Sequence, residues 1–242
     1  MNTDPCVLRV GGLSVHVVRR AIKNLHLGVY PPNGRVRVAA PLKVSDDSVR
    51  LAVIGKLGWI KRQQGKFLAQ IRQPEREMVS GESHYFLGRR YRLHVVKHRG
   101  VSRVVFRPRS TLELHVRAGM DAEARERALQ RWYRQQLREL ASPLLEKWQR
   151  TLGVKIAGWG IKRMKTKWGT CTVDARRVWL NLELVKKPVS CLEYVVVHEL
   201  VHLIDRQHDE QFLAVMDQHL PQWRRLRQEL NSAPLAHVTW KY

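Results

Sequence analysis

The sequence predicts an α+β fold in two parts, and three observations indicate it. Residues 7–40 and 82–117 carry short runs in which apolar and polar residues alternate, the period of two that is typical of strands. From Asp121 the apolar residues recur every three to four positions, which is the period of a helix. A stretch from Cys191 to Ile204 is apolar nearly all round and predicts a buried central helix. We therefore expect a β-rich N-terminal module at residues 1–118 and a second domain at residues 119–242.

The expected elements of the N-terminal module are strands around one helix. Strands over 7–10 and 13–18 flank a Gly11-Gly12 turn, and strands over 26–30 and 35–39 form a second hairpin. Ser45 is an N-cap residue for a helix that runs to about Ile71. The remaining expected strands cover residues 84–87, 91–97, 101–107 and 112–117.

The second domain is expected to begin with a long helix from Asp121, which Ser142-Pro143 should kink or break and Gly153 should end. Residues 154–182 predict a β-meander. The expected helices that follow run from Pro188 to about Arg206, from Asp209 to about His219, and through Leu230. No internal repeat is evident in the sequence.

The chain is strongly basic, with a formal net charge of +23. Residues 1–118 hold 23 Lys and Arg against 7 Asp and Glu, a larger excess than in residues 119–242. Such a surface attracts polyanions, so nucleic acid or a nucleotide is a possible partner of the N-terminal module. The alternative is a generally basic surface that binds nothing specific.

Several classes of protein are excluded by composition. No run of 18 apolar residues is present, so we expect no transmembrane helix and no membrane partner. The first residues lack the basic and apolar regions of a signal peptide. The three cysteines are odd in number and far apart, which suits a reducing cytoplasm, where we expect the protein to reside. The sequence does not indicate an oligomeric state.

The stretch that carries chemistry is His198-Glu199-Leu200-Val201-His202, followed by His208. Residues i and i+4 of a helix lie on one face, so His198 and His202 can offer two imidazole nitrogens to one ion. His208 is close enough for the chain to turn back onto the same ion. The adjacent carboxylate of Glu199 can reach a water there, and this pattern is typical of a zinc hydrolase with an open coordination position. We therefore predict one zinc ion per chain, held by these three histidines.

One other interpretation of this motif remains open. It is a pair of hydrogen-bonded core histidines beside a surface glutamate, although such polar groups are costly to bury without partners. The histidine spacing equals that of the metzincins, but the chain is not a metzincin in detail. Asp205 occupies the position of the metzincin turn glycine, and no Met-turn is evident.

With these motifs, the sequence resembles the YgjP-like metal-dependent hydrolases, relatives of the SprT-type and Wss-type zinc metalloproteases. The segments that carry the resemblance are Lys167-Trp168-Gly169-Thr170-Cys171-Thr172, Val178-Trp179-Leu180-Asn181-Leu182, residues 194–202, His208 and Phe212. The resemblance implies peptide-bond hydrolysis on peptide or protein substrates by a zincin-like C-terminal domain with a buried HExxH helix. It also implies that Trp168, Gly169 and Thr170 belong to an edge strand that binds substrate in extended form.

The predicted mechanism is hydrolysis by zinc-activated water, with Glu199 as the general base. One alternative is a zinc-dependent hydrolase of nucleotide phosphoanhydrides, in which lysines and arginines hold the phosphates. Another is a nucleic-acid-binding module with a structural metal, in which Asp209 or Cys171 would supply a fourth ligand.

Overall fold

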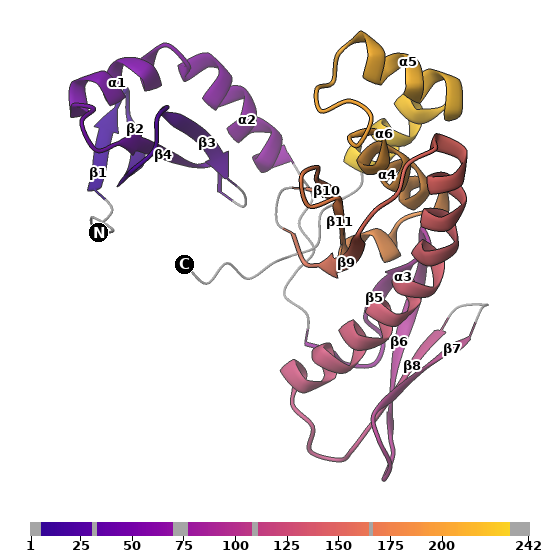
Figure 1. The fold of residues 1–242 in the computed structure, drawn as a ribbon. Coiled ribbons are helices and arrows are strands. Elements are labelled where there is room, and N and C mark those ends of the chain that lie inside the picture. The colour runs from indigo at the N-terminus through magenta and orange to yellow at the C-terminus, as the bar shows by residue number, and fades with distance from the viewer. Residues whose placement is uncertain (1–5, 31–32, 70–76, 108–110, 165–166, 233–242) are drawn as a thin grey trace. The chain divides into compact units, whose positions relative to one another are not determined.

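The chain divides into two compact units, and its computed structural model describes residues 6–30, 33–69, 77–107, 111–164 and 167–232. The first unit extends to Arg72 and the second begins at Gln73. The boundary that the sequence suggested, between residues 118 and 119, falls inside the second unit. The reason is packing: strands between residues 83 and 116 share one apolar core with the helices that follow. The described residues form an α+β fold with several sheets and six α-helices (Figure 1).

The first unit is one four-stranded sheet with two helices. Its strands are β1 (Cys6–Val10), β2 (Leu13–Arg20), β3 (His26–Tyr30) and β4 (Arg35–Pro41), in the order β1-β2-β4-β3. The two expected hairpins are present as antiparallel pairs, and β2 and β4 join them in parallel. The expected single helix is two helices, α1 (Asp46–Ile54) and α2 (Leu57–Ala69), because the first ends at Gly55. Ser45 caps α1, as expected, by accepting a hydrogen bond from Ser48 N at 3.2 Å.

The second unit begins with another four-stranded sheet and a long helix. Its strands are β5 (Ser83–Phe86), β6 (Arg89–Lys97), β7 (Arg103–Arg107) and β8 (Thr111–Val116), in the order β5-β6-β8-β7. Helix α3 (Ala122–Leu152) follows and packs on this sheet, where the rings of Trp132 and Tyr133 contact Phe86. Of the expected kink or break at Ser142-Pro143, the break does not occur, and the Ser142 hydroxyl donates to Arg138 O at 2.9 Å. It ends at Gly153, which adopts a φ of 64°.

The two four-stranded sheets are copies of one topology, a repeat that the sequence did not reveal. In each, two antiparallel hairpins are joined by a parallel pair, β2 with β4 and β6 with β8. The strand registers also correspond. Val15 of β2 lies opposite Val36 of β4, and at the matching place Leu93 of β6 lies opposite Leu112 of β8. In both copies the N-cap of the next helix lies five residues after the last buried residue of the preceding strand. Ser45 follows Ala40 of β4 in this way, and Asp121 follows Val116 of β8. Alternating strands can keep one fold with different apolar residues, which explains why no repeat is visible in the sequence.

The last part of the second unit surrounds the HExxH stretch. Its three strands are β9 (Gly158–Lys162), β10 (Gly169–Thr172) and β11 (Arg177–Asn181). The expected meander is wrong, because the order is β10-β11-β9 and β9 pairs in parallel with β11. β10 therefore lies at an edge of this sheet. A 3₁₀ turn, η1 (Leu182–Lys186), leads to helices α4 (Val189–Val201), α5 (Glu210–His219) and α6 (Trp223–Ser232). None of the helices in the described residues combines the length and the apolar character that crossing a bilayer requires.

Candidate metal centre

Helix α4 is the element that positions the site. It is buried nearly all round, from Cys191 to Val201, and α3, α5, α6 and the β10–β11 strands pack around it. It ends at Val201, earlier than the expected Arg206, and His202 is its C-cap residue. The chain then turns back, and Asp209 starts α5 by accepting hydrogen bonds from Gln211 N and Phe212 N. This turn brings His208 over the end of α4.

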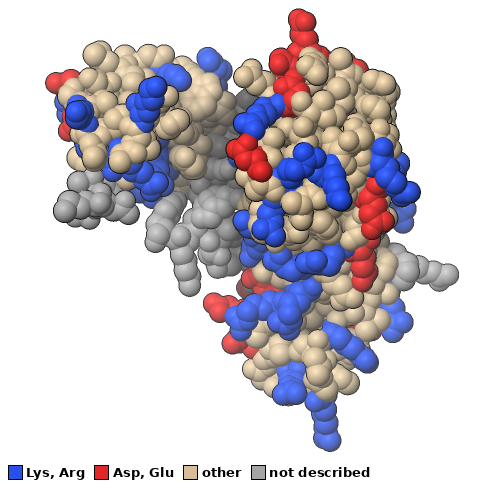
Figure 2. Space-filling view, in the orientation of Figure 1, with Lys and Arg blue, Asp and Glu red and all other residues tan. Residues whose placement is uncertain are grey.

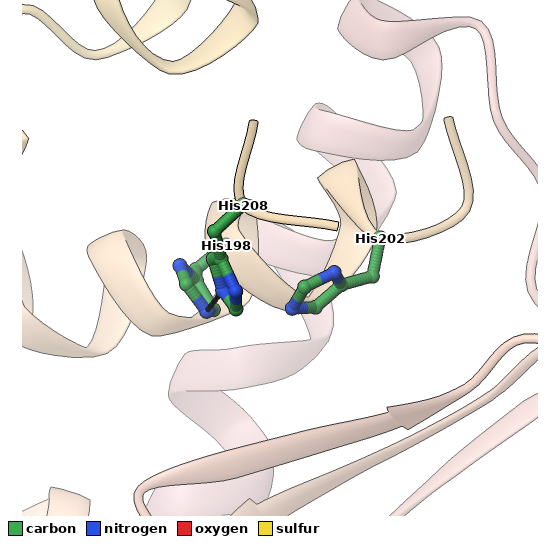
Figure 3. Close-up of side chains that lie close together, drawn as sticks. All are labelled: His198, His202 and His208. Atoms are coloured by element: carbon green, nitrogen blue, oxygen red, sulfur yellow. Dashed lines mark hydrogen bonds between the residues drawn. The ribbon is translucent and has the colours of Figure 1, made fainter. Parts of the chain in front are cut away.

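The three predicted histidines lie together, as Figure 3 shows. One ring nitrogen from each of His198, His202 and His208 lies within 4.8 Å of the others. The Nε2 atoms of His198 and His208 are 3.1 Å apart, and His202 approaches from the other side (Figure 3). The ring of Phe212 contacts all three imidazoles, at centroid distances of 4.7 to 5.1 Å. An apolar wall on one side and a helix on the other thus hold the imidazoles in place.

Burial favours the neutral form of His198 and His202. Burial lowers the pKa of His198 to about 3, and the neighbouring His202, His208 and Arg227 add to that effect. Burial also lowers the pKa of His202, while its hydrogen bond to the Asp205 carbonyl acts in the opposite direction. His202 Nδ1 lies 3.3 Å from that carbonyl oxygen and donates to it, so Nε2 keeps its lone pair. Neutral imidazoles with free lone pairs are the form in which histidine binds a metal.

Glu199 is the other buried polar group of α4, with 5 % of its surface exposed. Burial raises the pKa of its carboxyl group to about 7, although nearby Lys167 and a hydrogen bond from the Cys171 amide lower it in part. The carboxylate lies against Gly169, where a Cβ atom would be 2.6 Å from Glu199 Oε1 and 2.8 Å from Val195 Cγ1. Gly169 therefore provides the space for this carboxylate, a role that its place in the sequence did not indicate.

The edge strand β10 lies beside this carboxylate. Trp168 O accepts a hydrogen bond from Asn181 N at 2.8 Å, so in this antiparallel pair the main-chain groups of Gly169 and Cys171 face the open edge. Buried Asn181 holds the chain just before β10 in place, because its side-chain amide donates to Met164 O and to Lys167 O, both at 2.7 Å.

A pocket of about 870 Å³ opens over the histidines and β10. Trp168, Gly169, Thr170 and Cys171 line it together with Glu199 and the three histidines, so the structure brings all of the predicted site residues to one pocket. Tyr194 also lines it, and its ring stacks on Trp223 at 6.5 Å. Three basic residues on separate segments, Lys167, Arg206 and Arg227, line the pocket as well. The sequence did not single out these three, since nothing in their spacing links them to the motif.

The donors present fit a metal ion with an open coordination position. Tetrahedral ligands of zinc lie about 3.3 Å from one another, close to the 3.1 Å between His198 Nε2 and His208 Nε2. His198 Nδ1 is buried and has no hydrogen-bond partner among the described residues, so this imidazole is not held by hydrogen bonds alone. The cluster of potential ligands holds the three histidines and neither Asp209 nor Cys171. Asp209 caps α5, and burial raises the pKa of the Cys171 thiol to about 11, which keeps it protonated.

Comparison with known proteins identifies the family. The family model of the YgjP-like metallopeptidase domain matches residues 23–233, which is most of the chain. The chain belongs to the YgjP-like metallopeptidase family. A metallopeptidase family implies a metal cofactor and peptide or protein substrates, and hydrolysis as the reaction. No curated protein matches the sequence.

Two solved structures resemble part of this YgjP-like chain. They are metallopeptidase zymogens, abylysin of Pyrococcus abyssi and jannalysin of Methanocaldococcus jannaschii, with TM-scores of 0.35 and 0.34. Each is 18 % identical and covers 36 % of this chain, with 89 % and 84 % of the respective zymogen covered.

The contact between Gly169 and Glu199 yields a first prediction for the YgjP-like site. In Gly169→Ala the new methyl group would meet the Glu199 carboxylate and Val195, so those side chains must shift. Overpacking of this kind costs about 1–3 kcal/mol of folding free energy. We expect hydrolysis to fall at least tenfold while the metal content stays unchanged, because misplacing a reacting group by about 1 Å can cost about 100-fold.

The measurement is the hydrolysis rate, the metal stoichiometry and the melting temperature of Gly169→Ala. A matched control is Gly65→Ala, on α2, where an added Cβ has no neighbour within 4 Å. Full activity in Gly169→Ala would show that the Glu199 carboxylate does not need its present position.

Proposed function

We propose that this YgjP-like protein is a zinc-dependent metallopeptidase, with one zinc ion per chain held by His198, His202 and His208. The single observation that carries the proposal is the convergence of three imidazoles beside a buried carboxylate, in a pocket bordered by an open strand edge. Three protein ligands leave a coordination position for water or substrate, whereas structural zinc sites normally have four.

Glu199 is the proposed general base. When bound, zinc supplies a Lewis acid that polarises the scissile carbonyl and makes water more acidic. The Glu199 carboxylate takes a proton from the attacking water and then delivers it to the leaving amine. A pKa raised by burial toward neutrality suits a group that must first accept and then donate a proton near pH 7. The Cys171 amide, by donating to this carboxylate, orients it toward the pocket.

The proposed substrate site is the edge of β10, with Trp168, Gly169 and Thr170. An extended peptide can add to this edge as a further strand, because the main-chain groups of Gly169 and the carbonyl of Cys171 face outward there, while the Cys171 amide donates to Glu199. Lys187 lies 5.4 Å from the Trp168 ring centroid, which supports the indole at the mouth of the pocket.

The proposed zincin-like domain lies within residues 119–242, with α4 as its buried HExxH helix. These residues contain every group assigned to the reaction. The β5–β8 sheet shares their core and supports α3, which in turn packs on α4. We infer that this sheet is part of the structural support of the catalytic domain.

A second candidate reaction is hydrolysis of a nucleotide phosphoanhydride at the same site. The observation that favours it is the basic lining of the pocket, since Lys167, Arg206 and Arg227 could hold phosphate oxygens. Asp174 forms an ion pair with Arg206, which leaves Lys167 and Arg227 as the stronger candidates.

The experiment that separates these reactions uses the full chain loaded with zinc. Casein and a library of fluorogenic peptides would be assayed beside a panel of nucleoside triphosphates, with and without a chelator. We expect chelator-sensitive cleavage of peptides. Chelator-sensitive release of pyrophosphate or phosphate with no peptide cleavage would replace the peptidase assignment by the nucleotide reaction. Hydrolysis of neither substrate class by zinc-loaded protein would contradict both.

A further inference from the structure

The outer face of the first sheet carries positive charge with no acidic residue. In β1 to β4 the inward residues are buried, among them Val15, Val17, Val36 and Val38, so the alternate residues face outward. The charged and aromatic residues of that outer face are Arg9, His16, Arg20, His26, Tyr30, Arg35 and Arg37. Helices α1 and α2 lie on the other side of the sheet, where Val49, Val53 and Ile60 complete the core.

The positive charges of this face act on one another. Arg35 and Arg37 are two positions apart on β4, about 7 Å along the strand. His16 lies opposite Arg37 on β2, and Arg35 donates to its Nδ1 at 2.8 Å. Burial lowers the pKa of His16, and the charges of both arginines lower it further. The two arginines that disfavour protonation of this imidazole create a local positive potential.

An exposed aromatic ring lies within this positive face. Tyr30 is directly opposite Arg35 in the β3–β4 pair, and 42 % of its surface is exposed. A phenol ring of this kind on a sheet surface can stack on a base while the adjacent guanidinium meets a phosphate. An acidic peptide would use the arginines but has no need of the ring.

The second sheet provides an internal comparison, because its registers match those of the first. The position of Arg37 is occupied there by Glu113, and the position of Tyr30 by Arg107. Glu113 accepts a hydrogen bond from Arg107 at 3.1 Å and pairs with His115 at 3.2 Å. At the position of Arg37 the second sheet therefore has an acidic residue between basic ones, whereas the outer face of β1 to β4 has no acidic residue.

The first unit as a whole is basic as well. Residues 1–72 contain 13 Lys and Arg against 3 Asp and Glu, which gives a net charge of +10 in less than a third of the chain. In the space-filling view its visible surface has several separate Lys and Arg side chains, and acidic ones only at its left-hand edge (Figure 2). Long-range attraction of a polyanion precedes the local contacts described above.

We propose that the outer face of the β1–β4 sheet binds single-stranded nucleic acid. Arg35 and Arg37 bind consecutive phosphates, and Tyr30, the last residue of β3, stacks on an adjacent base. Four strands spaced about 4.8 Å apart give a platform about 14 Å wide, which suits two or three nucleotides. The first unit thus brings a nucleic acid to a chain whose second unit contains the metal centre.

The test is the fluorescence anisotropy of a labelled 12-nucleotide oligomer, RNA or DNA, titrated with the full zinc-loaded chain. We expect dissociation constants in the range of about 10⁻⁴ to 10⁻⁶ M that rise with salt. Arg37→Glu places on the first sheet the residue that the second sheet has at the matching position, and it should weaken binding at least tenfold. Loss of one phosphate contact should also reduce the slope of log K against log salt by about 0.7.

The controls separate a built site from general charge. Lys61→Glu changes the net charge equally but lies exposed on α2, and it should weaken binding no more than twofold. Tyr30→Ala should weaken binding about tenfold, whereas Tyr30→Phe, which keeps the ring, should bind within twofold of wild type. Melting temperatures of all variants establish that they fold.

Three outcomes would overturn the proposal. The first is the absence of oligomer binding by the wild-type protein. The second is equal weakening by Arg37→Glu and Lys61→Glu, which would assign the binding to net charge. The third is that polyglutamate of matched length binds as tightly as the oligomer and that Tyr30→Ala weakens the binding of neither, which would assign the face to acidic proteins. Hydrolysis of a small peptide should be unchanged in Arg37→Glu, so this result is independent of the proposed peptidase activity.

Discussion

His202→Ala is expected to abolish stoichiometric zinc binding and, with it, hydrolysis. Wild-type protein should retain about one zinc per chain after dialysis. Removal of groups that merely orient metal ligands lowers affinity about 10- to 100-fold, so removal of a ligand should exceed that range. His202 is suited to this test, because it is the half-buried C-cap residue of α4 and its removal leaves the core of the helix intact.

The measurement combines metal analysis with competition by a chelator of known affinity. His94→Ala is the matched control, since His94 is exposed on β6 and belongs to a different sheet. His208→Ala tests the third ligand separately and should also lower the affinity, since the Nε2 atom of His208 lies 3.1 Å from that of His198. Equal zinc content in wild type and His202→Ala would refute the assignment of the site.

The histidine cluster could be predicted from the sequence because its geometry is local. An i, i+4 pair shares a helix face wherever the helix lies. The five residues between His202 and His208 are enough for the chain to turn back once α4 has ended. Asp209 ensures that turn by capping α5, and Phe212 then closes the cluster against the imidazoles.

The surroundings of the cluster could not be predicted, because they depend on contacts between distant segments. Gly169 and Glu199 are 30 positions apart, and no spacing rule joins a glycine in a strand to a carboxylate on a helix. Arg227 reaches the pocket only because α6 packs on α4. The order of β9, β10 and β11 has the same origin, since the expected meander and the observed parallel pairing have the same alternation along each strand.

The sequence suggested a different division into units for a related reason. Strand patterns continue from the first sheet into the second and the period becomes helical only at Asp121, so the expected boundary lay after residue 118. The true criterion is which helix covers each sheet. α1 and α2 cover the first sheet and α3 covers the second, so the boundary falls after the first pair of helices.

Glu199→Gln is expected to retain zinc and to lose most of the hydrolytic activity. The amide keeps the size of the side chain and a hydrogen-bonding oxygen but removes the basic carboxylate. The Cys171 amide can still donate to that oxygen, so the side chain should keep its place beside Gly169. General-base catalysis contributes roughly 10² to 10⁴ in rate, and turnover should fall by about that factor.

The pH dependence of stability offers an independent check that Glu199 is buried as a carboxyl group. Its pKa in the folded metal-free protein, about 7, lies above the ordinary value of 4.5, so the folded state binds its proton more tightly than the unfolded state. That contribution to stability is complete below pH 4.5 and is lost as the pH rises through 7. Metal-free Glu199→Gln has no carboxyl group at this position, so it does not lose this stability as the pH rises. The difference in melting temperature between variant and wild type should therefore move in favour of the variant between pH 5 and pH 8.

The decisive comparison is between Glu199→Gln and Glu210→Gln, measured as zinc stoichiometry, melting temperature and rate on the same peptide. Glu210 is exposed in the first turn of α5, close in sequence to His208, and its replacement should leave all three quantities unchanged. Loss of zinc together with activity in Glu199→Gln would make the carboxylate a ligand or a structural group. Unchanged turnover with zinc still bound would show that Glu199 does not transfer the proton. The three histidines would then be interpreted as a site for a metal that the reaction does not use. Retained zinc with a rate lowered at least 100-fold is the result that joins the buried carboxylate to the chemistry of the site.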